Sequence, residues 1–86
     1  MDWEKVGEVV HYFDRISVAA VILEDTLAVG DWIAFVWDGE LIFEQEVASM
    51  QIDHVRVTVG YTGDNVGLQV RDLVKLGVEV YKQGTE

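Results

Sequence analysis

The sequence contains no cysteine, no proline and few basic residues. Because cysteine is absent, disulfide frameworks, thiolate metal sites and cysteine nucleophiles are excluded. Residues 1–5 lack the basic and apolar regions of a signal peptide, and the longest apolar run, 16–23, is too short to cross a bilayer. We therefore expect a cytoplasmic protein that has no membrane partner.

The scarcity of basic residues leaves the chain strongly acidic. Six Lys and Arg stand against sixteen Asp and Glu, giving a formal net charge of −10. Such a charge repels phosphate backbones, so an RNA partner is disfavoured, although it stays possible. The acidity serves solubility or life in a saline cytoplasm, and the alternative is an acidic face that docks on a protein partner.

The length limits the number of hydrophobic cores. The chain has 86 residues, and half of them are apolar. This is enough for one core and leaves no room for a second, so we expect a single domain over residues 1–86. An apolar content this high also predicts folding without a cofactor.

The apolar residues follow a two-residue period or form short β-branched runs, and both patterns indicate strands. Asp38-Gly39 between apolar runs predicts a two-residue hairpin turn, and a change of phase near Ala48 predicts a bulge. We expect an all-β fold, a small closed antiparallel barrel of about six or seven strands with a Greek-key-like order. The predicted strands cover residues 5–13, 16–23, 32–37, 40–52, 55–60, 65–71 and 78–82.

The run 16–23 is apolar on both faces, which is typical of a central strand or of a strand whose outer face meets a partner. We take Val21 to face outward and to contact a protein partner, together with Trp37 in the predicted hairpin.

Catalytic patterns are missing from the sequence. No Gly-rich loop with Lys and Ser or Thr is present, so nucleotide binding by that route is excluded. His11 and His54 lie far apart in the sequence and have no recognisable nucleophile nearby, which favours ordinary strand positions. Glu44 and Glu46 share one strand face and could hold a cation, but a solvated face is the better interpretation. We expect no enzyme activity, no metal and no cofactor.

A small basic cluster is a candidate binding site. His54 and Arg56 lie on the polar face of one predicted strand, and Arg71 ends another. If these strands are neighbours, they form a basic patch on an acidic body, and the alternative is pairing with nearby carboxylates.

The aromatic residues have two interpretations. Trp3, Trp32, Trp37 and Tyr61 could form a base-stacking platform, but such platforms lie in basic grooves. Core packing and plugging of the barrel ends explain most of them better, with one aromatic, such as Tyr61, left as an exposed contact.

Short motifs follow one another in a recognisable order. Gly30 and Gly63 suit tight turns, and an aspartate follows each glycine and can hydrogen-bond turn amides. Gly67 permits close backbone approach beside an inward Val66. The motifs, which include Asp31, Asp64 and Met50, are Leu-Ala-Val-Gly-Asp at 27–31, Val-Ala-Ser-Met at 47–50, Gly-Asp-Asn-Val-Gly-Leu at 63–68 and Gly-Val-Glu-Val-Tyr at 77–81.

In their order these motifs resemble domain II of the translational GTPases, the β-barrel of elongation factor Tu and its relatives, and the whole looks most similar to stand-alone elongation-factor-like proteins. The resemblance implies contacts with a GTPase domain, the acceptor end of tRNA and ribosomal RNA. Similar barrels also serve as accessory modules of collagenase-like peptidases. The first hypothesis is a non-catalytic interaction module that docks on a protein partner. The alternative is a translation-associated binder of tRNA or ribosomal RNA, without GTPase activity, that uses His54, Arg56 and Arg71.

Overall fold

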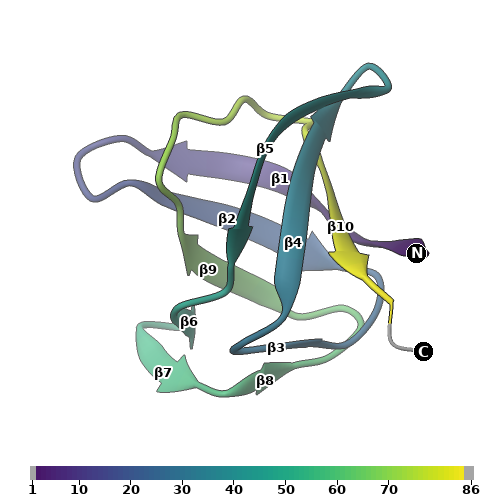
Figure 1. Ribbon diagram of the computed structural model, residues 1–86. Helices are drawn as coiled ribbons and strands as arrows, with labels where there is room; N and C mark the ends of the chain where they lie inside the picture. Colours follow the sequence, from purple (N-terminus) through teal and green to yellow (C-terminus); the bar gives the residue numbers. More distant parts are fainter. Residues whose placement is uncertain (1, 85–86) are drawn as a thin grey trace.

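The computed structural model describes residues 2–84 as an all-β protein (Figure 1). Every strand pairing is antiparallel, which confirms this part of the expected fold. Within residues 2–84 no helix is long and apolar enough to span a membrane. The strands are β1 (Trp3–Phe13), β2 (Val18–Leu23), β3 (Leu27–Ala28), β4 (Trp32–Trp37), β5 (Glu40–Glu46), β6 (Met50–Ile52), β7 (Val55–Val57), β8 (Val59–Gly60), β9 (Asn65–Gln69) and β10 (Glu79–Gln83).

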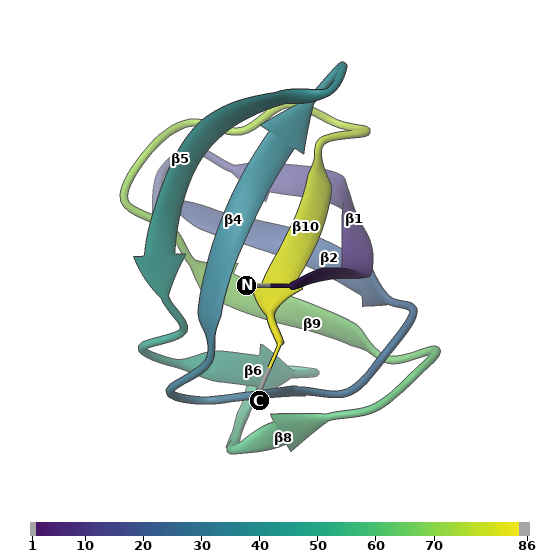
Figure 2. The ribbon, with the colours of Figure 1, turned by 45° about the vertical axis from the view of Figure 1, so that its right-hand side comes forward.

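The strands form one large curved sheet and one small ribbon. The large sheet has eight strands in the order β5-β4-β10-β1-β2-β9-β6-β7, and β3 pairs with β8 in the ribbon. Figures 1 and 2 show β5, β4 and β10 crossing over β1, β2 and β9. The hydrophobic core lies within this curved sheet, with Val6, Phe35 and Val80 among its fully buried side chains.

The expected closure into a barrel is not confirmed. Within residues 2–84 the large sheet has two end strands, β5 and β7, and no backbone ladder joins them. The side chain of Gln45, on β5, forms hydrogen bonds with the backbone at the end of β9. Gln45 Nε2 donates to the backbone oxygen of Gln69 at 2.8 Å, and the backbone N–H of Arg71 donates to Gln45 Oε1 at 3.0 Å. The side-chain amide of Gln45 thus donates one hydrogen bond and accepts another, as a backbone peptide group does in a β-ladder.

The predicted hairpin at Asp38-Gly39 is confirmed. Asp38 has φ 52° and Gly39 has φ 79°, so both central residues adopt the left-handed conformation that a type I′ turn requires. The predicted strand 40–52 is interrupted at 47–49, close to the expected bulge. There Val47 exchanges backbone hydrogen bonds with Gly30 and Asp31, so it pairs with the loop before β4.

The outward orientation expected for Val21 is wrong. Its side chain is 0% exposed and belongs to the core, because it lies on the inner face of β2 with Ala19 and Leu23. Ile22, which is 36% exposed, has the outward position instead. The apolar run has no polar residue on its outer face, so the sequence could not show which alternate residues face the core.

The turn residues behave as their chemistry predicts. Gly30 has φ 99° and Gly63 has φ 92°, conformations that side chains other than glycine rarely adopt. Asp31 Oδ2 and Asp64 Oδ2 each accept a hydrogen bond, at 2.9 Å, from the backbone N–H three residues earlier. These interactions fix the loops that lead into β4 and β9.

Two other motif residues act in packing. Met50 is fully buried, and Gly67 lies on β9 between β2 and β6. A Cβ at Gly67 would lie 3.2 Å from Val18 Cγ1, which is tighter than ordinary contact. Gly67 therefore permits the close approach that the sequence indicated, and Val66 beside it is buried.

Candidate functional site

The β4–β5 hairpin projects from one end of the molecule (Figure 1). Several of its apolar side chains are exposed to solvent. Leu41 is 56% exposed, and Trp37 is 46% exposed. Together with Val74 and Val78 they line a shallow hollow of about 210 Å³. We name this surface the hairpin patch and define it as Trp37, Leu41, Ile42 and Leu73.

A second hollow, of about 370 Å³, shares Leu41 with the hairpin patch. It lies on the outer face of the sheet, because Ala34 alternates along β4 with the core residues Ile33 and Phe35. We name it the outer groove. Its lining comprises Ala34 and Val36 of β4, Leu41 and Glu44 of β5, Glu79 and Tyr81 of β10, Trp3 of β1, and Gly39 in the turn.

The register of the strands explains the shape of the outer groove. Tyr81 lies opposite Ala34, and Ala34 lies opposite Glu44, so one row crosses three strands. The next row places Glu79, Val36 and Leu41 side by side in the same way. The small Ala34 and the branched Val36 form the floor between longer side chains on β10 and β5.

Aromatic donors hold both carboxylates of the groove. Trp32 Nε1 donates to Glu44 Oε1, and the Tyr81 hydroxyl donates to Glu79 Oε1 at 3.1 Å. The bond to Glu79 raises the pKa of Tyr81 above its usual range, and partial desolvation adds to the shift. The Tyr81 phenol therefore remains protonated, and a hydrogen-bond donor, to a higher pH than an ordinary tyrosine.

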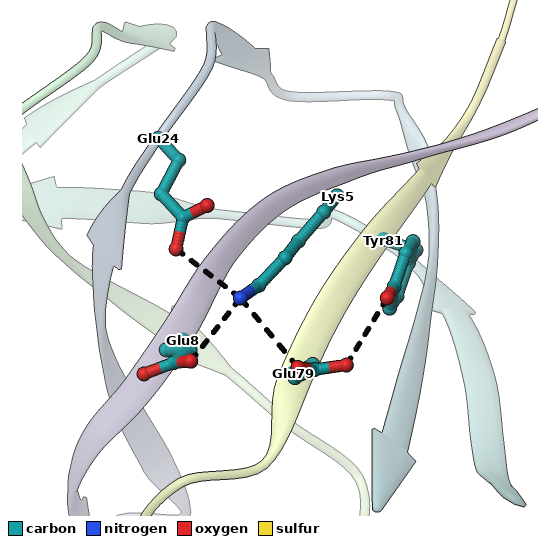
Figure 3. A network of polar contacts seen from close by, with 5 residues as sticks. All are labelled: Lys5, Glu8, Glu24, Glu79 and Tyr81. Atoms are coloured by element: carbon teal, nitrogen blue, oxygen red, sulfur yellow. Dashed lines mark hydrogen bonds and ion pairs between the residues drawn. The ribbon is translucent and has the colours of Figure 1, made fainter. Parts of the chain in front are cut away.

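Lys5 lies beside the groove in a cluster of carboxylates (Figure 3). Its Nζ is 3.1 Å from Glu8 Oε2, 3.4 Å from Glu24 Oε2 and 3.5 Å from Glu79 Oε2. The hydrogen bond to Glu8 is the main cause that raises the pKa of Lys5, and desolvation opposes it. Three carboxylates around one ammonium group leave the cluster with excess negative charge.

The predicted basic patch is not formed as expected. β6 lies between β7, which carries Arg56, and β9, so the two strands are not neighbours. His54 is not a strand residue, because it has φ 65° in the turn between β6 and β7. Arg71, beyond the end of β9, lies over the ring of Phe43 with its Cζ 5.5 Å from the ring centroid.

The aromatic residues are less buried than expected. Trp3, Trp32, Trp37 and Tyr61 are all exposed, so core packing is the wrong interpretation for them. They lie on β1, on β4 and in the loop before β9, and only Trp3 lines the outer groove. The exposed contacts expected at Tyr61 and Trp37 stay predictions.

Neither the outer groove nor the Lys5 cluster was predicted from the sequence. The sequence does contain the relevant pattern, because Trp3 and Lys5 are two residues apart and share one face of β1. Glu79 and Tyr81 share one face of β10 in the same way. Joining them requires the pairing of β10 with both β1 and β4, which links the last predicted strand to two distant segments. Local periodicity carries no information about that pairing.

Residues 2–84 contain no cluster of three or more His, Asp or Glu that could hold a metal ion. Within the same range no polar or charged residue is buried.

Comparison with known proteins gives relatives among peptidases. No family model matches the chain. It is 35% identical over 77 residues to an uncharacterized protease of Methanocaldococcus jannaschii, a match that covers 90% of this chain but 19% of that protein. Among solved structures, the C-terminal domain of a Geobacillus thermoleovorans protein assigned to the U32 peptidases has a TM-score of 0.84 at 18% identity, covering 94% of this chain and 93% of that one. Its selenomethionine variant has a TM-score of 0.81 at 17% identity, covering 93% and 99%.

These relatives overturn the resemblance to elongation factor domain II. The two hypotheses that depended on it, a translation-factor-like docking module and a binder of tRNA or ribosomal RNA, are wrong as stated. The motifs misled because their Gly and Asp residues serve tight turns, and turn chemistry specifies a backbone rather than an activity. The chain has the fold of the U32 peptidase C-terminal domain.

Proposed function

We propose that this chain is an accessory domain that acts beside the catalytic unit of a U32-type peptidase. The match to the archaeal protease carries the proposal, because it covers nearly the whole chain and only 19% of that protein. Most of the archaeal protein lies outside the match, and we assign peptide-bond cleavage to that part. The likeness to a solved U32 C-terminal domain supports the same assignment.

The surface chemistry supports a role without catalysis. Catalytic acids, bases and nucleophiles act through preorganised groups shielded from water. Within residues 2–84 no charged or polar side chain is buried, and both histidines are exposed. The hairpin patch and the outer groove, which meet at Leu41, are candidate binding surfaces and support this role.

We assign these surfaces to the polypeptide on which the peptidase acts. Exposed contiguous apolar side chains on a small protein mark interaction sites, and a groove beside them can hold an extended chain. An accessory domain that holds the substrate raises the concentration of peptide bonds near the catalytic unit. The gain is expected for long substrates, which reach both parts, and not for short ones.

Three expectations from the sequence remain part of this proposal. They are the single domain over residues 1–86, the cytoplasmic location, and a barrel-like closure of the sheet. Gln45 supports the closure, because its side-chain amide connects β5 to the backbone after β9.

The experiment replaces the matched segment of the archaeal protease with this chain. Hydrolysis of an unfolded protein and of a short peptide is measured for the intact protease, for the protease without the segment, and for the chimera. We expect deletion to lower kcat/KM for the protein substrate while the short peptide is cleaved as before, and the chimera to restore the loss. Equal loss on both substrates, no loss on either, or cleavage by this chain alone would contradict the proposal.

A further inference from the structure

We propose that the outer groove binds a positively charged side chain, lysine or arginine, of an extended polypeptide. The choice of a polypeptide rests on the proposed function, and the choice of a cation comes from the groove itself.

The floor of the outer groove leaves room for one side chain. Ala34 lies between Tyr81 and Glu44 in one row across three strands. Because neighbouring strands are about 4.8 Å apart, the backbones that carry Tyr81 and Glu44 are separated by roughly 10 Å. An alanine at the centre of this row leaves a gap between the two longer side chains, and Val36 continues the floor in the next row.

The walls of the groove are apolar along their length and acidic at two points. Leu41 and Trp3 on the walls, with Val36 on the floor, offer contact to the aliphatic stem of lysine or arginine. Such a side chain readily buries its stem while its charged head stays in a polar environment. The rings of Trp3 and Tyr81 can also attract a cation over their faces. An uncharged apolar ligand would use the same walls but would leave Glu44 without a cationic partner.

The two carboxylates face the groove from opposite sides. Glu44 is on β5 and Glu79 is on β10, with β4 between them. Trp32 and Tyr81 each donate a hydrogen bond to one of them, so their orientation is fixed before a ligand arrives. A site that is organised in advance loses less conformational entropy on binding.

The carboxylate of Glu44, on the β5 side of the groove, has no cationic partner among the described residues. Within residues 2–84 the ion pairs of this face all belong to Lys5, which contacts Glu8, Glu24 and Glu79. No cationic side chain of the described residues pairs with Glu44. With a formal charge of −10 on the whole chain, the surroundings reinforce the attraction for a cation.

The test is a titration of the intact chain with short unstructured peptides. Binding is monitored by NMR through the chemical shifts of the nitrogen-15-labelled backbone amides. One peptide carries a central arginine, and the comparison peptide carries citrulline, which has the same shape without the charge. We expect the arginine peptide to bind more tightly by about three- to tenfold at low salt, the range of a partly exposed ion pair with an aromatic contact. The shifts should centre on Ala34, Val36 and Glu44.

A matched pair of variants separates the groove from general charge attraction. Glu44→Gln removes the charge but keeps an acceptor for Trp32, and Glu46→Gln makes the same change two residues further along β5, outside the groove lining. We expect Glu44→Gln to abolish the preference for arginine over citrulline and Glu46→Gln to retain it. A preference that both variants reduce equally, equal binding of the two peptides, or no binding would overturn the proposal.

Failure here and failure of the proposed function give different results. If the groove does not select cations, the chimera can still restore cleavage of long substrates, and the accessory role then stands without this specificity. If the chimera fails while arginine is selected, the groove binds cations but serves another protein.

Discussion

Replacing Gln45 with alanine should destabilise the protein more than its half-buried position at the surface suggests. The side chain donates to Gln69 O at 2.8 Å and accepts from Arg71 N at 3.0 Å. Each such bond contributes about 0.5–1.5 kcal/mol net, and partial exposure places the pair near the lower end, at about 1–2 kcal/mol. Since 1 kcal/mol shifts the Tm of a domain of this size by about 4–8 °C, we expect a fall of roughly 4–16 °C.

Thermal unfolding followed by circular dichroism measures this effect against two comparisons. Gln51→Ala is the matched control, because Gln51 is an exposed glutamine on β6. Gln45→Glu keeps the acceptor for Arg71 but places a carboxylate oxygen against Gln69 O, so it should cost at least as much as alanine. If Gln45→Ala and Gln51→Ala lower the Tm equally, or Gln45→Glu is harmless, the amide does not connect β5 to β9 energetically.

Three further predictions concern the core, a close approach and alkaline pH. Val21→Asp should unfold the protein, because an unpaired buried charge costs more than about 4 kcal/mol of folding free energy. Ile22→Asp, at the neighbouring outward position, should cost under about 1 kcal/mol. A native far-UV circular dichroism spectrum for Val21→Asp would contradict the burial of Val21. Gly7→Ala places a Cβ 2.5 Å from Ile22 O and 2.7 Å from Val21 Cγ1, so urea unfolding should show a loss of about 1–3 kcal/mol, and an unchanged midpoint would refute the contact. The folded state raises the pKa of Lys5 and of Tyr81, so the stability that both groups contribute is complete below their unfolded pKa values and is lost as the pH rises through the folded ones. The Tm should therefore fall as the pH rises above about 10, and less steeply in the double variant Lys5→Met, Tyr81→Phe; equal slopes would exclude these groups as the cause.

Local chemistry in the sequence predicted local structure well. Asp38-Gly39 specified a turn because few dipeptides accept positive φ at both positions, and the structure has that turn. Asp31 and Asp64 accept the hydrogen bonds expected of turn aspartates. Such features depend on residues only a few positions apart, and so the sequence alone could specify them.

Features that depend on pairing between distant segments were predicted less well. Val21 was placed on the wrong face because all the residues of its strand are apolar, so no polar residue marks the outward face. The outer groove went unnoticed because Glu44, Ala34 and Tyr81 meet only when β10 enters the sheet beside β4. The basic patch was assembled from strands that β6 separates in the structure.

The position of β10 also has a consequence for synthesis of the chain. Of the strands in residues 2–84, β10 is made last, yet it lies between β4 and β1 in the sheet. Before β10 is made, β4–β5 and β1–β2 can form as separate hairpins, but no backbone ladder joins the two. The inward side chains of both hairpins then remain open to other nascent chains. Folding is therefore completed only when the final strand appears, and truncation before Glu79 would leave two sheet fragments with unpaired edges.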